Sequence, residues 1–238
     1  MKKICVSLLL ITGVVAIFTS CRKVHGEGPA VTESRSEKNF SGIEMGIPGE
    51  LYYIPGTSYS IEITAPRNIL EIIQTHFSDN VLKVRAKSGV FIKSNEQIIV
   101  KVIAPDLTGL GVSGSGNITV SDPYQPSNIN LSASGSGGIT IAKLNTDKLD
   151  AKISGSGKIE VYAGVASEET LSVSGKGNID ITGLSAEQAN TNTSGSGTIR
   201  LNVTTSLDCK ISGSGVVMYK GSPKISSSIS GSGRLIPI

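Results

Sequence analysis

Residues 150–161 read DAKISGSGKIEV, and residues 170–181 read TLSVSGKGNIDI. The two stretches share a Ser-Gly-X-Gly phrase that recurs through the second half of the chain. Its copies begin 18 to 21 residues apart, at Ser113, Ser134, Ser154, Ser174, Ser194, Ser212 and Ser230. A period this regular is typical of a solenoid, in which each repeat is one coil that buries its apolar face by stacking on the next.

Apolar and polar residues alternate on both sides of each copy. Two residues after the second glycine come Ile118, Ile139, Ile159, Ile179, Ile199, Val217 and Leu235. The residues beside these are mostly polar, as expected for a strand with one buried face. Each coil is therefore predicted to contain a strand, a Gly-X-Gly corner and a second strand, with like residues stacked over like.

The sequence predicts an all-β fold, a right-handed parallel β-helix-like solenoid of 18–21-residue coils over residues 109–238. Left-handed β-helices have a six-residue period. The spacing between the repeated phrases does not follow that period, so the right-handed form is favoured. A β-prism or a propeller is the alternative, although a propeller blade usually takes about 40 residues. Within each corner the middle residue is predicted to face water, because Lys176 replaces serine there.

Residues 37–108 lack the repeated phrase and are predicted to be an N-terminal β-rich cap or the first coils of the stack. A small separate β domain is the alternative. Apolar residues between Asn68 and Phe77 have helical spacing and predict a short helix there. The expected strands cover residues 50–54, 59–64, 81–86 and 97–103.

Residues 1–20 are predicted to be a lipoprotein signal peptide. Two lysines precede an apolar run over residues 4–18, and small residues lie directly before Cys21. This arrangement resembles the bacterial lipobox, which implies that Cys21 is lipidated; an ordinary signal peptide is the alternative. Residues 21–36 are polar, with glycine and proline, and are predicted to be a tether. Cys209 is then predicted to be a buried free thiol.

Composition argues against several classes of function. Without the two lysines of the signal peptide, basic and acidic residues nearly balance, so nucleic acid is not an expected partner. The Gly-X-Gly phrases precede strands rather than helices and lack the residues of a phosphate-binding loop. With two histidines in the chain, no metal, cofactor or catalytic residue is predicted.

Two sets of residues are candidates for binding. Glu160, Asp180 and Arg200 hold the same outward position on consecutive coils, so their Cα atoms should lie about 5 Å apart. Paired carboxylates could serve a polysaccharide-cleaving β-helix, or they could form a solvated column in which Arg200 offsets its acidic neighbours. Aromatic residues gather near the N-terminus at Tyr52, Tyr53 and Tyr59, where they predict either a binding patch or core packing.

The run SGSGN before Ile118, echoed by SGKGN before Ile179, resembles the head GIN domain family when it is combined with a lipobox. This family consists of bacterial envelope proteins described as auto-transporter adhesins. The resemblance covers about residues 38–220. It implies a right-handed parallel β-helix-like fold at the cell envelope, and it brings no catalytic residues with it.

Taken together, these features predict a non-enzymatic envelope protein that binds a glycan or a protein ligand. Lipid on Cys21 would hold it in the outer membrane of a Gram-negative bacterium. Both the periplasmic and the surface side are open, and Arg22-Lys23 after the cysteine favours the periplasm slightly. One alternative is a carbohydrate-active enzyme that uses Glu160 and Asp180; another is a structural protein that assembles into homo-oligomers through the solenoid end.

Overall fold

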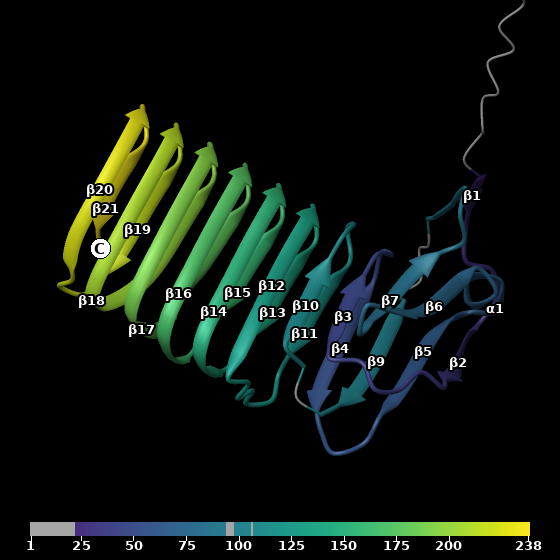
Figure 1. Cartoon of the computed structure of the whole chain (residues 1–238). Helices are drawn as coiled ribbons and strands as arrows, with labels where there is room; N and C mark the ends of the chain where they lie inside the picture. The colour runs from purple at the N-terminus through teal and green to yellow at the C-terminus, as the bar shows by residue number, and fades with distance from the viewer. Residues whose placement is uncertain (1–21, 94–97, 106) are drawn as a thin grey trace, which may run out of the picture.

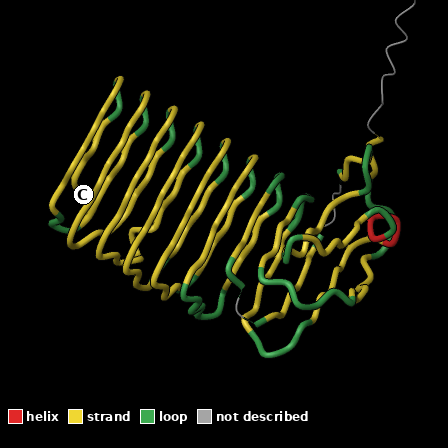
Figure 2. The backbone as a smooth tube through the Cα atoms, in the orientation of Figure 1, coloured by secondary structure: helices red, strands yellow, loops and turns green. Residues whose placement is uncertain are grey.

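The structure, a computed structural model, describes residues 22–93, 98–105 and 107–238. The predicted signal peptide and Cys21 lie outside the described residues. About 69% of the chain is strand and 2% is helix. Parallel strands stack coil upon coil along one axis (Figure 1), and loops gather at the corners of the coils (Figure 2). The predicted all-β solenoid is therefore confirmed, and the strands form neither a prism nor a propeller.

The first part of the chain contains β1 (Arg22–Val24), β2 (Ala30–Arg35), β3 (Gly42–Met45), β4 (Glu50–Pro55), β5 (Ser60–Pro66), α1 (Arg67–Leu70), β6 (Ile73–Ser78), β7 (Val81–Ala86), β8 (Val90–Ile92) and β9 (Ile99–Ala104). The repeat region contains β10 (Gly109–Val112), β11 (Asn117–Val120), β12 (Asn128–Gly135), β13 (Gly138–Ile141), β14 (Leu144–Gly155), β15 (Lys158–Val161), β16 (Gly164–Gly175), β17 (Asn178–Gly195), β18 (Thr198–Gly213), β19 (Val216–Lys220), β20 (Lys224–Gly231) and β21 (Arg234–Pro237).

The repeat strands build two broad walls. The strands before each Ser-Gly-X-Gly corner form the long-strand wall: β10, β12, β20 and the C-terminal parts of β14, β16, β17 and β18. The strands after each corner form the short-strand wall: β11, β13, β15, β19, β21 and the N-terminal parts of β17 and β18. The pairings are parallel and align like positions of the repeat, so Ile159 pairs with Ile139 on one side and with Ile179 on the other. The β17–β18 pairing shifts register only in the segment between the two walls.

Both walls continue into the N-terminal part, but not in chain order. β3 and β4 pair in parallel with β10 and β11, and β7 and β9 pair in parallel with β3 and β4. The coil that comes later in the chain therefore lies further from the repeats. Antiparallel strands then cover this end: β6 lies on β7, β5 on β9, and β2 on β5. We call this end of the stack the cap end.

The helix predicted over residues 68–77 is wrong for most of its length. Only α1 is helical, and residues 73–78 form β6 on the edge of β7. Ile69, Leu70 and Ile73 are buried, as the apolar spacing predicts, whereas Phe77 is 47% exposed. A short helix is only marginally stable by itself. Residues 73–78 instead form backbone hydrogen bonds with the free edge of β7 and so become a strand.

Part of the segment predicted to be a tether is strand. β1 pairs in parallel with β8, and β2 pairs antiparallel with β5 over all six of its residues. Thr32 and Thr64 add a side-chain hydrogen bond of 2.8 Å across that second pairing. The chain is thus held against the cap end from Arg22 onward.

The apolar columns predicted from the repeats form the core. The inward residues after each corner are buried from Ile118 through Val217, and Cys209 is a buried free thiol, as predicted. On the last coil, Ile225 and Ile229 are 41% and 44% exposed.

Glycine at the corners is required by the backbone itself. Gly175 has a φ of +122°, and a Cβ there would lie 2.5 Å from the carbonyl oxygen of Gly155 on the preceding coil. That same oxygen accepts a hydrogen bond from the Lys176 amide at 2.8 Å. The corners therefore stack backbone against backbone, which leaves no space for a side chain. Lys176 is exposed, as the substitution of serine by lysine predicts.

We expect Gly175→Ala to lower the free energy of unfolding by about 2–4 kcal/mol, since it combines an unfavourable φ with a backbone clash. Lys176→Ala, at the exposed neighbouring position, should change it by no more than about 0.5 kcal/mol. Denaturant unfolding of both variants measures the difference. Equal stability of the two variants would show that the corner tolerates a Cβ.

Of the carboxylate side chains that the structure describes, one is buried in the core. Glu169 is 1% exposed and occupies an inward column whose other members include Leu149, Ala189 and Leu207. Neither of its carboxylate oxygens has a hydrogen-bond partner among the described residues. Burial raises the pKa of the Glu169 carboxyl well above its usual range, because the charged form loses its hydration. The folded protein therefore holds this group neutral over a wider pH range than the unfolded chain does.

This raised pKa predicts a specific pH dependence of stability. The folded state binds the Glu169 proton more tightly than the unfolded state, so the free energy of unfolding falls as pH rises above the unfolded pKa of about 4.3. The slope approaches about 1.4 kcal/mol per pH unit until the raised folded pKa is passed. Glu169→Leu should remove this slope and stabilise the protein at neutral pH. The control is Glu168→Gln at the exposed neighbour; a slope that persists in Glu169→Leu would contradict the assignment.

Candidate functional site

Two of the three N-terminal tyrosines contribute to core packing. Tyr53 is 1% exposed; its hydroxyl donates to the Ala104 carbonyl at 3.2 Å, and its ring lies edge to face against Tyr124 with ring centroids 5.4 Å apart. Tyr59 is half-buried and packs against the core, edge to face with Phe40 at a centroid distance of 5.0 Å. Core packing is the second of the two roles predicted for these residues. Tyr52 alone faces outward, at 37% exposure.

Tyr52 lies in the same outward column as the predicted charged residues. The register of the short-strand wall places one residue of each coil in this column. We call its six consecutive members Tyr52, Thr119, Thr140, Glu160, Asp180 and Arg200 the outer column; Lys101 continues it at the cap end, and Met218 and Ile236 continue it at the other end. The stacking of Glu160, Asp180 and Arg200 was predicted from the repeat spacing. The position of Tyr52 in this column was not predicted. The first coils lack the repeated Ser-Gly-X-Gly phrase, so the sequence does not show which of their residues pair with those of the repeats.

Arg200 does not pair with the carboxylates of Glu160 and Asp180, in contrast to the predicted column. Arg200 donates to the Asn178 side-chain oxygen at 3.2 Å rather than to a carboxylate. Glu160 is paired along its own strand instead, with Lys158 Nζ at 2.7 Å from Oε1. Hydrogen bonding to Glu160 raises the pKa of the Lys158 ammonium above its ordinary value. Asp180 accepts a bond of 3.0 Å from the Thr182 hydroxyl.

An exposed aromatic ring completes this surface. Tyr162 is 61% exposed, and its hydroxyl donates to Glu160 Oε2 at 3.2 Å. Both oxygens of Glu160 are therefore occupied, one by an ammonium and one by a phenol. The arrangement presents a ring face beside fixed donors and acceptors on the outside of a wall, which suits recognition of a polar ligand. We call Lys158, Glu160, Tyr162, Asn178, Asp180 and Arg200 the outer-face cluster.

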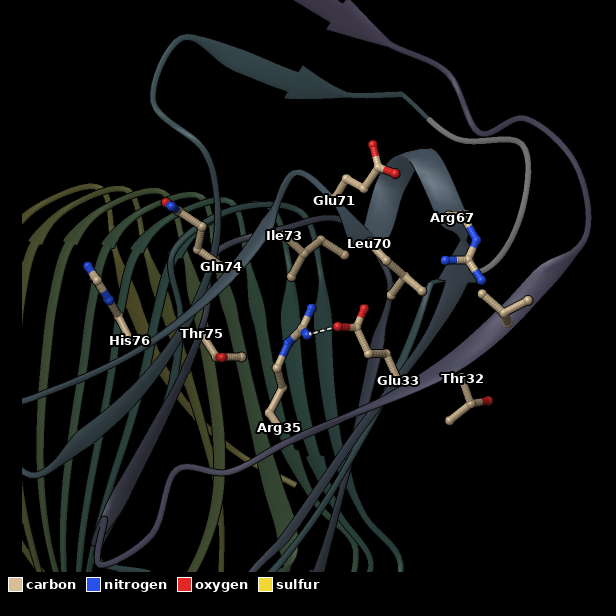
Figure 3. Close-up of a pocket in the computed structure, with 11 residues that line it drawn as sticks. Thr32, Glu33, Arg35, Arg67, Leu70, Glu71, Ile73, Gln74, Thr75 and His76 are labelled. Atoms are coloured by element: carbon tan, nitrogen blue, oxygen red, sulfur yellow. Dashed lines mark hydrogen bonds and ion pairs between the residues drawn. The ribbon is translucent and has the colours of Figure 1, made fainter.

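A pocket at the cap end was not predicted from the sequence. It has a volume of about 630 Å³ and is lined by residues of β2, α1 and β6. Figure 3 shows Arg35 joined to Glu33 on one side, with Arg67 on α1 and Glu71 directly after it. The buried side chains of Leu70 and Ile73 also line it. Its lining comes from three separate segments, one of them within the predicted tether, so no local pattern could have indicated it.

Two further features, a cluster of metal ligands and a membrane-spanning helix, are absent from the described residues. Among residues 22–93, 98–105 and 107–238, no group of three or more histidine, cysteine, aspartate or glutamate side chains is placed to hold a metal ion. Within the same ranges, no helix has both the length and the apolar character needed to cross a membrane.

Comparisons with known proteins agree with this fold. The family model described as "Putative auto-transporter adhesin, head GIN domain" matches residues 39–223. A crystal structure of a "putative adhesin" from Bacteroides fragilis is 28% identical, with a TM-score of 0.84 over 90% of this chain and 100% of that one. No curated protein matches the chain at a significant level.

Two further solved structures are similar. A "putative lipid binding protein" from Parabacteroides distasonis is 25% identical, with a TM-score of 0.74 over 91% of this chain and 100% of its own. A "putative adhesin" from Parabacteroides merdae is also 25% identical, with a TM-score of 0.67 over 91% of this chain and 99% of its own.

The position of the outer-face cluster predicts that its charged residues contribute little to stability. We expect Glu160→Gln and Asp180→Asn each to change the free energy of unfolding by no more than about 1 kcal/mol, because these half-buried carboxylates pair only with groups at the surface, where ion pairs and hydrogen bonds contribute little. Thermal or denaturant unfolding measures this. A larger loss would indicate that these carboxylates are needed to hold the coils together and would weaken their candidacy as ligand contacts.

Proposed function

The chain belongs to the head GIN domain family, and we propose that it is a lipid-anchored, non-enzymatic protein of the cell envelope that binds carbohydrate through the outer-face cluster. The observation that carries the proposal is the exposed ring of Tyr162 beside the side chains of Glu160 and Asp180. Sugar C–H faces stack on such rings, while carboxylates, amides and guanidinium groups bind the hydroxyls. The names of the structural relatives, two of them adhesins, support a binding role.

The rigid wall behind the cluster supports this role. Glu160, Asp180 and Arg200 lie on strands paired on both sides, with buried isoleucines on the inner face of the wall. Tyr162 directly follows β15, and its amide donates to the Ile141 carbonyl at 3.0 Å. Strand spacing fixes the step between coils at about 4.8 Å, which is close to the length of one sugar residue along a chain. A polymeric ligand could therefore meet equivalent positions on successive coils with little ordering cost.

A carbohydrate-active enzyme that uses Glu160 and Asp180 is the second candidate function. The adjacent register of the two residues favours it, since glycosidases act with two carboxyl groups. Against it, a general acid needs a proton to give, and Glu160 accepts bonds from Lys158 and Tyr162 at both oxygens. Release of reducing ends from a polysaccharide, abolished by Glu160→Gln, would establish the enzyme.

The carbohydrate proposal is tested by glycan-array binding with the mature chain. Tyr162→Ala should weaken binding to any glycan found by about tenfold or more, because central aromatic contacts dominate such interfaces. Asp150→Asn, on the outer face of the long-strand wall, is the matched control and should bind normally. Absence of binding to any glycan, or equal binding by both variants, would refute the role of this face; a protein ligand is then the remaining partner class.

Lipidation of Cys21 is tested separately by metabolic labelling with an alkyne fatty acid. We expect label on the natural chain and on Cys5→Ala, and none on Cys21→Ala, because acylation needs the thiol of that residue. Label that persists in Cys21→Ala would contradict the anchor. Protease treatment of intact cells then distinguishes an outer-membrane protein on the surface from one facing the periplasm.

A further inference from the structure

A small ribbon of two strands projects from the cap end. β1 and β8 pair in parallel, with Arg22 opposite Val90, Lys23 opposite Phe91 and Val24 opposite Ile92. The Arg22 amide donates to the Gly89 carbonyl at 2.9 Å, and the Lys93 amide donates to the Val24 carbonyl at 2.7 Å. This sheet of β1 and β8 is separate from the sheet that forms the stack.

One face of the ribbon is held by the core and the other is open. Ile92 is buried, and Val24 packs against the core cluster. Since side chains alternate along a strand, Lys23 and Phe91 point together to the opposite side. Phe91 is 62% exposed, although burying such a ring against protein would be favourable by about 2 kcal/mol.

Basic residues lie in the ribbon and directly beside it in the chain. Arg22, Lys23, Lys87 and Lys93 are all exposed, and residues 22–24 and 87–93 contain no acidic residue. The nearby Arg85 is already paired with Glu44 at 2.8 Å. An exposed aromatic ring on a ribbon with four exposed cations matches the interface of an anionic bilayer, where the ring enters the headgroup region and the cations meet phosphates.

We propose that the β1–β8 ribbon docks the protein on an anionic lipid surface, with Phe91 inserted at the interface and Arg22, Lys23, Lys87 and Lys93 on the headgroups. This inference deepens the proposed anchoring: the ribbon begins one residue after Cys21, so an acyl chain there would bring it to the bilayer. The lipid anchor and the basic ribbon would act together, because their free energies of membrane binding add.

Docking at this point sets the orientation of the whole molecule. β1 lies at the cap end of the stack, and β20 and β21 lie at the other end (Figure 1). The coils would therefore extend away from the membrane. Four steps of about 4.8 Å separate the coil of β7 and β9 from the coil that carries Tyr162, which places the outer-face cluster about 20 Å further from the bilayer than the cap end.

The chain contains no tryptophan, so a single introduced indole reports its own surroundings. In the full lipidated protein reconstituted into vesicles of phosphatidylcholine and phosphatidylglycerol, Phe91→Trp should show a blue-shifted emission that brominated lipid quenches. The matched control is Phe77→Trp on β6, a phenylalanine that is 47% exposed on the same end but outside the ribbon. Its emission should stay that of a water-exposed indole. Equal emission of the two variants in vesicles would overturn the docking.

A second measurement separates docking from lipidation. Residues 22–238, which hold every described strand, should bind phosphatidylglycerol-containing vesicles but not pure phosphatidylcholine vesicles, and added salt should weaken that binding. Replacing Lys23 and Lys93 by glutamine should lower the affinity about fivefold each, and Phe91→Ala about tenfold. Absence of binding would overturn the docking and leave the Cys21 anchor untouched. Binding without fatty-acid label on Cys21 would uphold the docking and refute the anchor.

Discussion

Close backbone contact between successive corners is the constraint on which the rest of the structure depends. Each Ser-Gly-X-Gly corner accepts hydrogen bonds from the next, as the Gly155 carbonyl does from the Lys176 amide. A coil can therefore not slide along its neighbour without losing these bonds and bringing side chains into a space that admits only glycine. Because the corners are in register, the strands before and after them are also in register, and the two walls follow.

This register determines what the interior and the surface contain. Inside, isoleucine stacks on isoleucine, and buried polar residues interrupt the apolar columns at a few positions, such as Thr191, Thr193 and Glu169, which lies between Leu149 and Ala189. Outside, the same register aligns side chains that are far apart in sequence, so a single column joins Tyr52 to Arg200. The surface is thus a linear array, and a linear polymer is the ligand that could use it most fully.

The sequence revealed those features that repeat and missed those that do not. The corner spacing predicted the coils, the buried isoleucines and the alignment of Glu160 with Asp180, because strand alternation translates spacing directly into side-chain direction. The helix expected at residues 68–77 became mostly strand, since an open edge on β7 outweighed local spacing. The reversed order of the first coils, and with it the place of Tyr52, depends on long-range pairing that no local pattern records. The cap-end pocket and the β1–β8 ribbon went unpredicted for the same reason.

The pairing of β1 with β8 changes the physical meaning of the N-terminal segment. A flexible tether would let the domain rotate freely about a lipid anchor, and the exposed face of the solenoid would have no preferred direction. With Arg22 already in a strand, a lipid on the residue before it can leave only a short, constrained link. If Cys21 is lipidated as proposed, the charge and the aromatic ring of the ribbon would act at high effective concentration next to the bilayer, where individually weak contacts combine. An adhesive surface gains from such restraint: a stack that stands away from the membrane presents its outer column to ligands in solution or on another surface instead of lying against its own lipid.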